Sequence, residues 1–148
     1  MKVNEIMSKD VITVPVEMSV HDLAELFVKK NISGAPVVDN EGKLLGIVQE
    51  EGVIFQDKKV HLPTFINISL GFLTLGIKRF EEEMKKITAN KVGEIMVKEP
   101  LTMSSNISIE DAATIMIENK QYYFPVLDNE ILVGIMTKKD IVKAIAKI

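Results

Sequence analysis

The residues of this chain with the clearest potential for chemistry lie in the stretch GIMTKKDI, residues 134–141. Thr137 supplies a hydroxyl, Lys138 and Lys139 supply positive charge, and Asp140 supplies a carboxylate ahead of the apolar run IVKAIAKI. A carboxylate can accept hydrogen bonds from two adjacent hydroxyls, and a helix N-terminus offers free N–H groups to an anion. Thr137 and Asp140 also form a helix-capping signal, and capping alone would explain both residues.

The lysines favour a ligand, because their counterparts earlier in the chain carry the opposite charge. Positive charge in the first helical turn opposes the helix dipole by roughly 0.3–1 kcal/mol per residue, and a bound phosphate would reverse that balance. The earlier stretch GIVQEEGV, residues 46–53, has Glu50 and Glu51, which suit a helix start but repel phosphate, and Gly52 in place of a carboxylate. The contrast predicts that the later stretch binds a ligand and that the earlier one is mainly structural.

These two stretches belong to an internal repeat. VNEIMSKDVIT at 3–13 aligns with VGEIMVKEPLT at 92–102, at an offset of 89 residues that separates Met7 from Met96. The same offset carries Pro36 onto Pro125. A chain of 148 residues is about one domain in size, so the repeats are expected to be two halves that bury their apolar faces against each other.

Each half is predicted to form a strand, a helix, two strands and a second helix. VITV at 11–14 and LTM at 101–103 suit short strands. Ser19 and Ser108 begin S-x-x-D capping signals, which predict helices over 20–31 and 109–120. The segments 35–48 and 124–136 are predicted to be strand pairs with Asp and Asn in their turns.

The paired IM dipeptides, the PV-hydrophobic-D strands and the GI-hydrophobic-T-x-x-D end of the second copy together resemble the cystathionine β-synthase (CBS) domain. Two in tandem resemble a Bateman module. The resemblance implies an α+β fold (α/β-like) of two βαββα units, packed sheet to sheet about a pseudo-twofold axis with two clefts between them. We expect repeat 1 at 1–57, an inserted connector at 58–90 and repeat 2 at 91–148.

What is known of that family implies a regulatory protein rather than an enzyme. Its members bind adenosine-containing ligands such as AMP, ADP, ATP and S-adenosylmethionine, and commonly form disc-shaped dimers. We therefore expect an adenine nucleotide or adenosine derivative bound mainly through repeat 2, with no catalytic cofactor. The signal would be a conformational change, read by an unknown protein effector, in a chain that forms a homodimer.

The resemblance also implies roles for individual residues. By position, Thr137 contacts phosphate and Asp140 takes the ribose hydroxyls. The predicted ligand site of repeat 2 comprises Thr137, Asp140, Lys138, Lys139, Leu101, Thr102, Tyr123, Phe124 and Pro125. A weaker cleft on repeat 1 comprises Ile12, Thr13, Gly34, Ala35 and Pro36.

One departure from the family's pattern leaves an alternative open. Tyr122, Tyr123 and Phe124 stand where family members often keep small residues near the base. Aromatic faces can stack on an adenine, worth roughly 1–3 kcal/mol in nucleic-acid complexes, or they can simply fill the cleft. If they fill it, the chain is a structural or interaction module that binds no ligand and dimerises through its connector.

The connector holds an unusually apolar segment at 60–77, followed by a predicted helix over 77–91. The segment approaches a membrane span in length, but His61, Pro63 and Asn67 make its first half polar and irregular. We expect a buried hairpin or helix, or a contact with a dimer mate or partner, rather than membrane insertion.

Composition and missing motifs narrow the remaining function classes. A net charge of −3 without a long basic run argues against a nucleic-acid surface. With no cysteine and two histidines outside metal-binding spacings, no metal site is expected, and a reducing compartment fits. No export signal is visible at the N-terminus, so a cytoplasmic location is expected.

Overall fold

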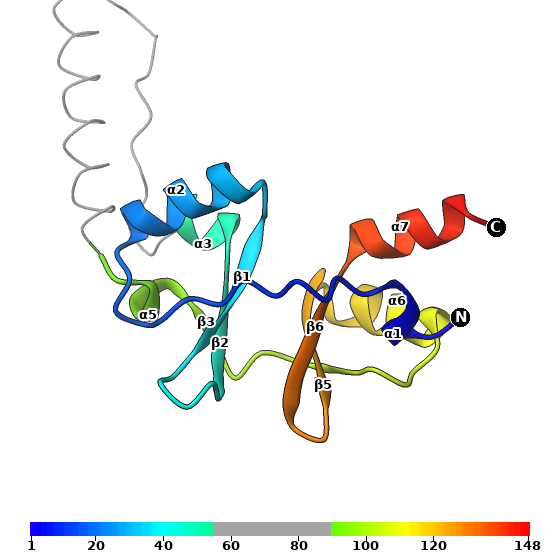
Figure 1. Cartoon of the computed structure of the whole chain (residues 1–148). Helices are drawn as coiled ribbons and strands as arrows, with labels where there is room; N and C mark the ends of the chain where they lie inside the picture. Colours follow the sequence, from blue (N-terminus) through cyan, green and yellow to red (C-terminus); the bar gives the residue numbers. More distant parts are fainter. Residues whose placement is uncertain (55–89) are drawn as a thin grey trace, which may run out of the picture.

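The structure is a computed structural model, and it describes residues 1–54 and 90–148 (Figure 1). The predicted apolar connector segment and nearly all of the predicted helix at 77–91 lie outside these ranges. Within the two ranges, no helix is long and apolar enough to cross a membrane.

The described residues form two halves that share a short first helix, a long helix, a strand pair and a last helix, and the second half has two further short strands. The first half contains α1 (Val3–Ile6), α2 (Val20–Lys30), β1 (Gly34–Val38), β2 (Leu44–Gln49) and α3 (Glu50–Ile54). The second contains α5 (Val92–Ile95), β3 (Val97–Lys98), β4 (Met103–Ser104), α6 (Ile109–Asn119), β5 (Tyr123–Asp128), β6 (Ile131–Thr137) and α7 (Lys138–Ala146).

The two long helices begin where the capping signals predict. The Ser19 hydroxyl oxygen accepts a hydrogen bond from the Asp22 backbone N–H at 3.1 Å, and Ser108 accepts one from Asp111 at 3.1 Å. These bonds satisfy N–H groups that have no partner within the helix. The capping predictions for α2 and α6 are therefore confirmed.

Residues 1–54 and 90–148 form two three-stranded sheets, in the orders β1-β2-β3 and β4-β5-β6. β1 pairs with β2, and β5 with β6, as antiparallel hairpins. In the second half β4 runs parallel to β5. The strand predicted at 11–14 is reduced to one parallel bridge between Val14 and Val37.

The segment that opens each repeat, residues 3–12 or 92–101, packs on the other repeat and is called the crossing segment. The Val3 N–H donates to the Ile107 carbonyl at 3.0 Å, and the Val92 N–H donates to the Met18 carbonyl at 2.8 Å. These bonds are equivalent at the 89-residue offset. In Figure 1, α1 accordingly lies beside α7 and β6, while α5 lies beside β2 and β3. The sequence repeats are thus not the packing units.

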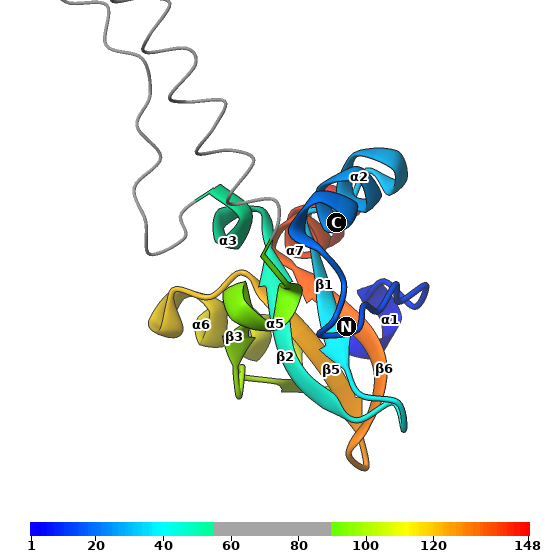
Figure 2. The same cartoon turned by 90° about the vertical axis from the view of Figure 1, so that its left-hand side faces the viewer.

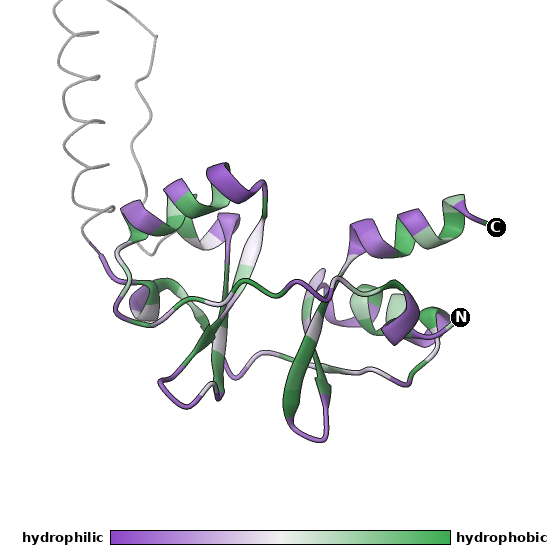
Figure 3. Cartoon of the chain, in the orientation of Figure 1, coloured by the Kyte–Doolittle hydropathy of each residue, from purple (hydrophilic) through white to green (hydrophobic). Residues whose placement is uncertain are grey.

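Each packing unit has its own apolar core, and the two cores correspond position by position. One core contains Val14, Leu23, Phe27, Ala35, Val37, Val48 and Val92. The other contains Val3, Met103, Ala112, Met116, Phe124, Val126 and Met136. The strands and inner helix faces that form them are hydrophobic, and the hairpin turns are hydrophilic (Figure 3). Val3 and Val92 are completely buried, and burial of each side chain stabilises the packing of its segment on the other repeat by roughly 1.5–3 kcal/mol.

The sheets also meet each other at a small apolar cluster. Ile47 of β2, Tyr123 of β5 and Ile135 of β6 are buried together, with Val11 packed against them. Ile47 and Ile135 are equivalent positions of the two repeats, so the pseudo-twofold axis passes near them. Figure 2 shows the β1–β2 hairpin lying over the β5–β6 hairpin at this contact. The predicted α+β fold of two units packed sheet to sheet is confirmed.

Equivalent glycines allow the crossing segments to lie on the sheets. A Cβ at Gly46 would lie 2.6 Å from the Val97 carbonyl oxygen. A Cβ at Gly134 would lie 2.5 Å from Met7 Sδ and 3.0 Å from the Ser8 carbonyl oxygen. The end of a methionine side chain can move, but a paired backbone carbonyl cannot move without breaking the sheet.

We therefore predict that Gly46→Ala lowers the free energy of unfolding by about 1–3 kcal/mol, the usual cost of overpacking. Gly134→Ala should cost less, because the flexible Met7 side chain can yield. Chemical denaturation measures both. Gly42→Asn is the control for backbone strain without overpacking: Gly42 has φ +83°, where a side chain is strained, but a Cβ there would meet no atom within 4 Å. A Gly46→Ala variant as stable as the parent would contradict the crossed arrangement.

Candidate ligand-binding cleft

A cavity of about 530 Å³ opens between the two halves. Its volume falls within the range of roughly 300–1,000 Å³ that is usual for small-molecule sites. It is lined by Ser8, Asp10, Ile12, Asn31, Ile32, Ser33, Gly34, Gln49, Glu50, Glu51, Tyr122, Tyr123, Ile135, Thr137, Lys138 and Lys139. The first three belong to the part of the first crossing segment that follows α1, so this segment forms part of the wall.

The two main walls have the same backbone arrangement. At the start of α3, the Glu50 N–H donates to the Ser33 carbonyl at 3.0 Å. At the start of α7, the Lys138 N–H donates to the Tyr122 carbonyl at 3.2 Å. The stretches GIVQEEGV and GIMTKKDI therefore face the same cleft from opposite sides. Their contrast in charge becomes a contrast between the two walls of one cavity.

The structure brings together only part of each predicted site. Thr137, Lys138, Lys139 and Tyr123 from the repeat 2 prediction share the cavity with Ile12 and Gly34 from the repeat 1 prediction. Eight predicted residues do not line this cavity: Leu101, Thr102, Phe124, Pro125 and Asp140, with Thr13, Ala35 and Pro36. The division into a stronger and a weaker site therefore does not match this cavity, to which both repeats contribute.

The Asp140 side chain caps the N-terminus of α7. Its side chain is buried, with 6% of the residue exposed, and one carboxylate oxygen accepts hydrogen bonds from the Thr137 N–H and hydroxyl, both at 2.8 Å. This is the capping role that the sequence left as an alternative. Direct contact between Asp140 and a ribose remains a prediction, whereas Thr137 already borders the cavity.

The three consecutive aromatic residues have three different environments. Tyr122 is exposed at the cleft, and the Lys138 ammonium lies 5.7 Å from its ring centre. Phe124 is fully buried in the core, where Phe124 and Ala112 replace Ala35 and Leu23 of the other core. Large and small residues have exchanged places, so Phe124 fills the volume that Ala112 leaves.

Tyr123 both packs and lines the cleft. It is 6% exposed, and a Cβ at Gly34 would lie 2.8 Å from its ring, so only glycine fits at the equivalent position of the other repeat. Burial raises the pKa of Tyr123 well above its ordinary value, so the phenol is neutral at physiological pH. Within residues 1–54 and 90–148, its hydroxyl makes no hydrogen bond.

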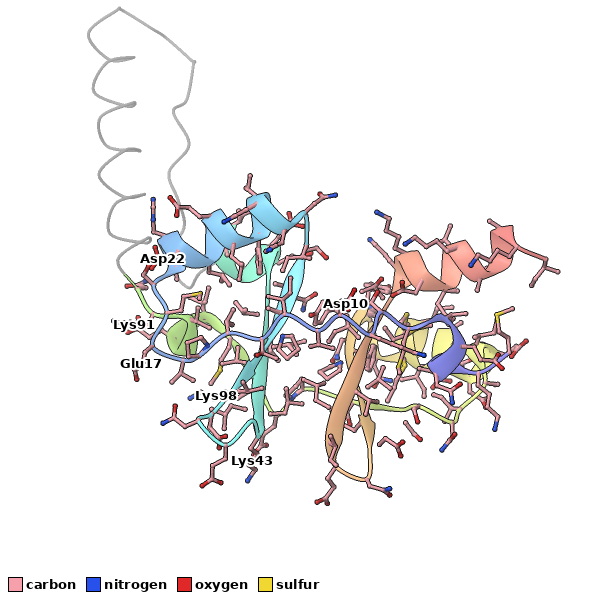
Figure 4. All side chains as sticks on the ribbon, viewed as in Figure 1. Asp10, Glu17, Asp22, Lys43, Lys91 and Lys98 are labelled. Atoms are coloured by element: carbon pink, nitrogen blue, oxygen red, sulfur yellow. The ribbon has the colours of Figure 1, made fainter. Side chains whose placement is uncertain are left out.

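The cleft carries charges of both signs. Asp10, Glu50 and Glu51 are exposed carboxylates that line it, and Lys138 and Lys139 are exposed ammonium groups that line it. In the described part of the chain, no ion pair joins any of these five side chains. Figure 4 shows Asp10 on the crossing segment between the two halves.

A separate group of potential ligand atoms lies outside the cleft. His21, Asp22 and Glu25, at the start of α2, place one atom each within 4.8 Å of one another. All three are exposed, and His21 lies 3.7 Å from Asp22 and 3.8 Å from Glu25. Contacts of this kind are common on exposed helix surfaces, and no role is assigned to them.

Comparison with known proteins agrees with the fold and the repeat. The model of the CBS domain matches residues 3–56 and 92–147. The chain belongs to the CBS domain family, as a tandem CBS-domain pair. It is 33% identical to the uncharacterised protein MJ1426 of Methanocaldococcus jannaschii over 98% of this chain and 91% of that one. It is 30% identical to the chloroplastic CBS domain-containing protein CBSX1 of Arabidopsis thaliana, over 99% of this chain and 64% of that one.

Two solved structures share the fold over nearly the whole chain. CBSX2 of Arabidopsis thaliana, solved in complex with AMP, is 27% identical and superposes with a TM-score of 0.70 over 99% of this chain and 96% of that one. The CBS domain pair of protein MJ0100, in complex with 5′-methylthioadenosine and S-adenosyl-L-methionine, is 24% identical, with a TM-score of 0.72 over 99% and 97%. The second likeness supports the fold alone.

The buried cap predicts a stability defect for Asp140→Ala. Removing the carboxylate leaves the Thr137 N–H and hydroxyl without their acceptor, so the free energy of unfolding should fall by about 1–2 kcal/mol without any ligand. The matched control is Lys139→Ala, an exposed neighbour in the same turn, which should change it by less than about 0.5 kcal/mol. If chemical denaturation gave the same stability for both variants, Asp140 would not be a structural cap.

Proposed function

We propose that this CBS pair is a regulatory, non-catalytic protein that binds an adenine nucleotide or adenosine derivative in the cleft between its halves. The observation that carries the proposal is the cleft itself, which has an adequate volume and polar walls from both repeats. The AMP complex of CBSX2, at 27% identity over nearly the whole chain, supports adenosine as the common part of the ligand.

The chemistry of the lining suits a nucleoside. The Tyr122 ring is exposed and can stack on a base, while the neutral Tyr123 hydroxyl can donate to or accept from a sugar or base atom. Lys138 and Lys139 offer two positive charges to an anionic group, and Thr137 lines the cavity beside them. The alternative, a module with filled clefts, has less support because Tyr123 and Phe124 leave the cavity open.

The position of the cleft also suits signalling. A ligand there would touch side chains of both packing units and the crossing segment that joins them. If the ligand binds two arrangements of the halves with unequal affinity, it shifts the equilibrium between them. The size of that shift is set by the difference between the two affinities. A protein effector in the cytoplasm would recognise the changed arrangement.

A homodimer is part of the same proposal. Val28 of α2, Ile117 of α6, and Val142 and Ile145 of α7 are each more than 60% exposed. Apolar side chains on outer helix faces are candidates for burial against a second copy.

The proposal predicts that adenosine ligands stabilise the protein. At about 100 times its dissociation constant, a ligand should raise the melting temperature by about 5–10 °C in a thermal-shift assay. Because the chain has two tyrosines and no tryptophan, a nucleotide retained in purification would also raise the 260/280 nm absorbance ratio. AMP, ADP, ATP and S-adenosylmethionine form the panel.

Ser33→Tyr tests whether the cleft is the site. Ser33 is exposed and lines the cavity, and its counterpart in repeat 2 is already Tyr122, so the fold accepts a tyrosine in this setting. The variant should lose most of the ligand-induced shift while keeping the melting temperature of the unliganded protein. Asn40→Tyr, on the exposed β1–β2 turn outside the cleft, is the control and should keep the shift. A parent protein that responds to no ligand would contradict the proposal.

A further inference from the structure

The charges of the cleft are segregated by wall. Glu50 and Glu51 begin α3 on one wall, and Lys138 and Lys139 begin α7 on the other, with equivalent backbone hydrogen bonds at both helix starts. The walls therefore differ in charge rather than in backbone geometry. Asp10, from the crossing segment, adds a third carboxylate to the lining.

The opposite charges do not neutralise one another. Salt bridges within 4.0 Å would form if these flexible side chains met, yet none joins them in the part of the chain that the structure describes. Lys138 instead lies over the Tyr122 ring. Space for a ligand therefore separates an acidic wall from a basic one.

This distribution of charge distinguishes between kinds of adenosine ligand. A triphosphate carries only negative charge, so attraction to two lysines is opposed by repulsion from the three carboxylates that line the same cavity. A ligand with a cationic group and an anionic group is attracted to both walls. Such a ligand also needs a contact for its neutral part between the charges.

Tyr123 supplies that contact. Tyr123 is 6% exposed, it lines the cavity, and its hydroxyl has no hydrogen-bond partner among the described residues. A buried hydroxyl without a hydrogen bond is costly, so it favours a ligand that provides one. A ribose hydroxyl or a base nitrogen is a suitable partner for a neutral phenol.

We propose that the cleft selects adenosine derivatives with a zwitterionic or cationic side chain, of the S-adenosylmethionine type, over nucleoside polyphosphates. The cationic group faces Glu50, Glu51 and Asp10, and the carboxylate faces Lys138 and Lys139. The inference rests on the proposed function, because it takes the ligand to be an adenosine derivative. It goes further by assigning a ligand-selecting role to the repeat 1 helix start.

Titration calorimetry of the full chain at constant ionic strength tests this selection with S-adenosylmethionine and ATP. The parent should bind S-adenosylmethionine at least about tenfold more tightly, the effect expected of a few screened charge contacts. The double variant E50Q/E51Q should lose most of that preference, with weaker binding of S-adenosylmethionine and stronger binding of ATP. K138Q/K139Q should weaken both ligands.

The matched control is E110Q/E118Q on α6, which removes two exposed carboxylates away from the cleft and should leave the preference unchanged. Tighter binding of ATP by the parent, or equal effects of E50Q/E51Q on both ligands, would overturn the selection while leaving adenosine binding intact. Binding of neither ligand, nor of AMP, would overturn the proposed function itself.

Discussion

The exchange of leading segments between the repeats is the constraint on which the rest of the structure depends. Val3 is buried in the core that the second repeat builds, and Val92 is buried in the core that the first repeat builds. Neither core is complete without a segment from the other repeat. The halves are therefore held in one relative position by burial and backbone hydrogen bonds as well as by the Ile47, Tyr123 and Ile135 cluster. The described part of the chain therefore forms one domain with two cores.

The same exchange creates the cleft. The segment from Ser8 to Ile12 crosses from one unit to the other and closes part of the cavity wall. With the halves fixed about the pseudo-twofold axis, the starts of α3 and α7 must face the same space. Substitutions in one repeat then act on a cavity shared with the other, so Glu50, Glu51, Lys138 and Lys139 form one electrostatic environment. The asymmetry of the repeats is a property of one site.

Much of this architecture could be predicted from local patterns. The 89-residue repeat, the serine caps at Ser19 and Ser108 and the hairpin turns depend on residues close together in sequence, and the structure contains all of them. The crossing could not be predicted in this way, because Val3 and Ile107 meet only in the folded chain. The sequence therefore assigned the ligand mainly to residues of repeat 2, with a weaker cleft on repeat 1.

The aromatic stretch shows the same limit at the scale of single residues. Because side chains alternate along a strand, Tyr123 faces the other sheet while Phe124 enters the core beside Met116. The sequence indicated three aromatic residues near the cleft but not which face each would occupy. A usable signal was present: at the 89-residue offset Tyr123 corresponds to Gly34, and such a large and small pair is expected to meet across a twofold axis.

The most direct test of the account is a crystal structure of the protein soaked with S-adenosylmethionine. The account predicts ligand density between the starts of α3 and α7, in contact with Tyr123 and with charged side chains of both repeats. Density beside Leu101 and Thr102, supported by residues of the second repeat alone, would contradict the shared cleft and restore separate sites for the two repeats.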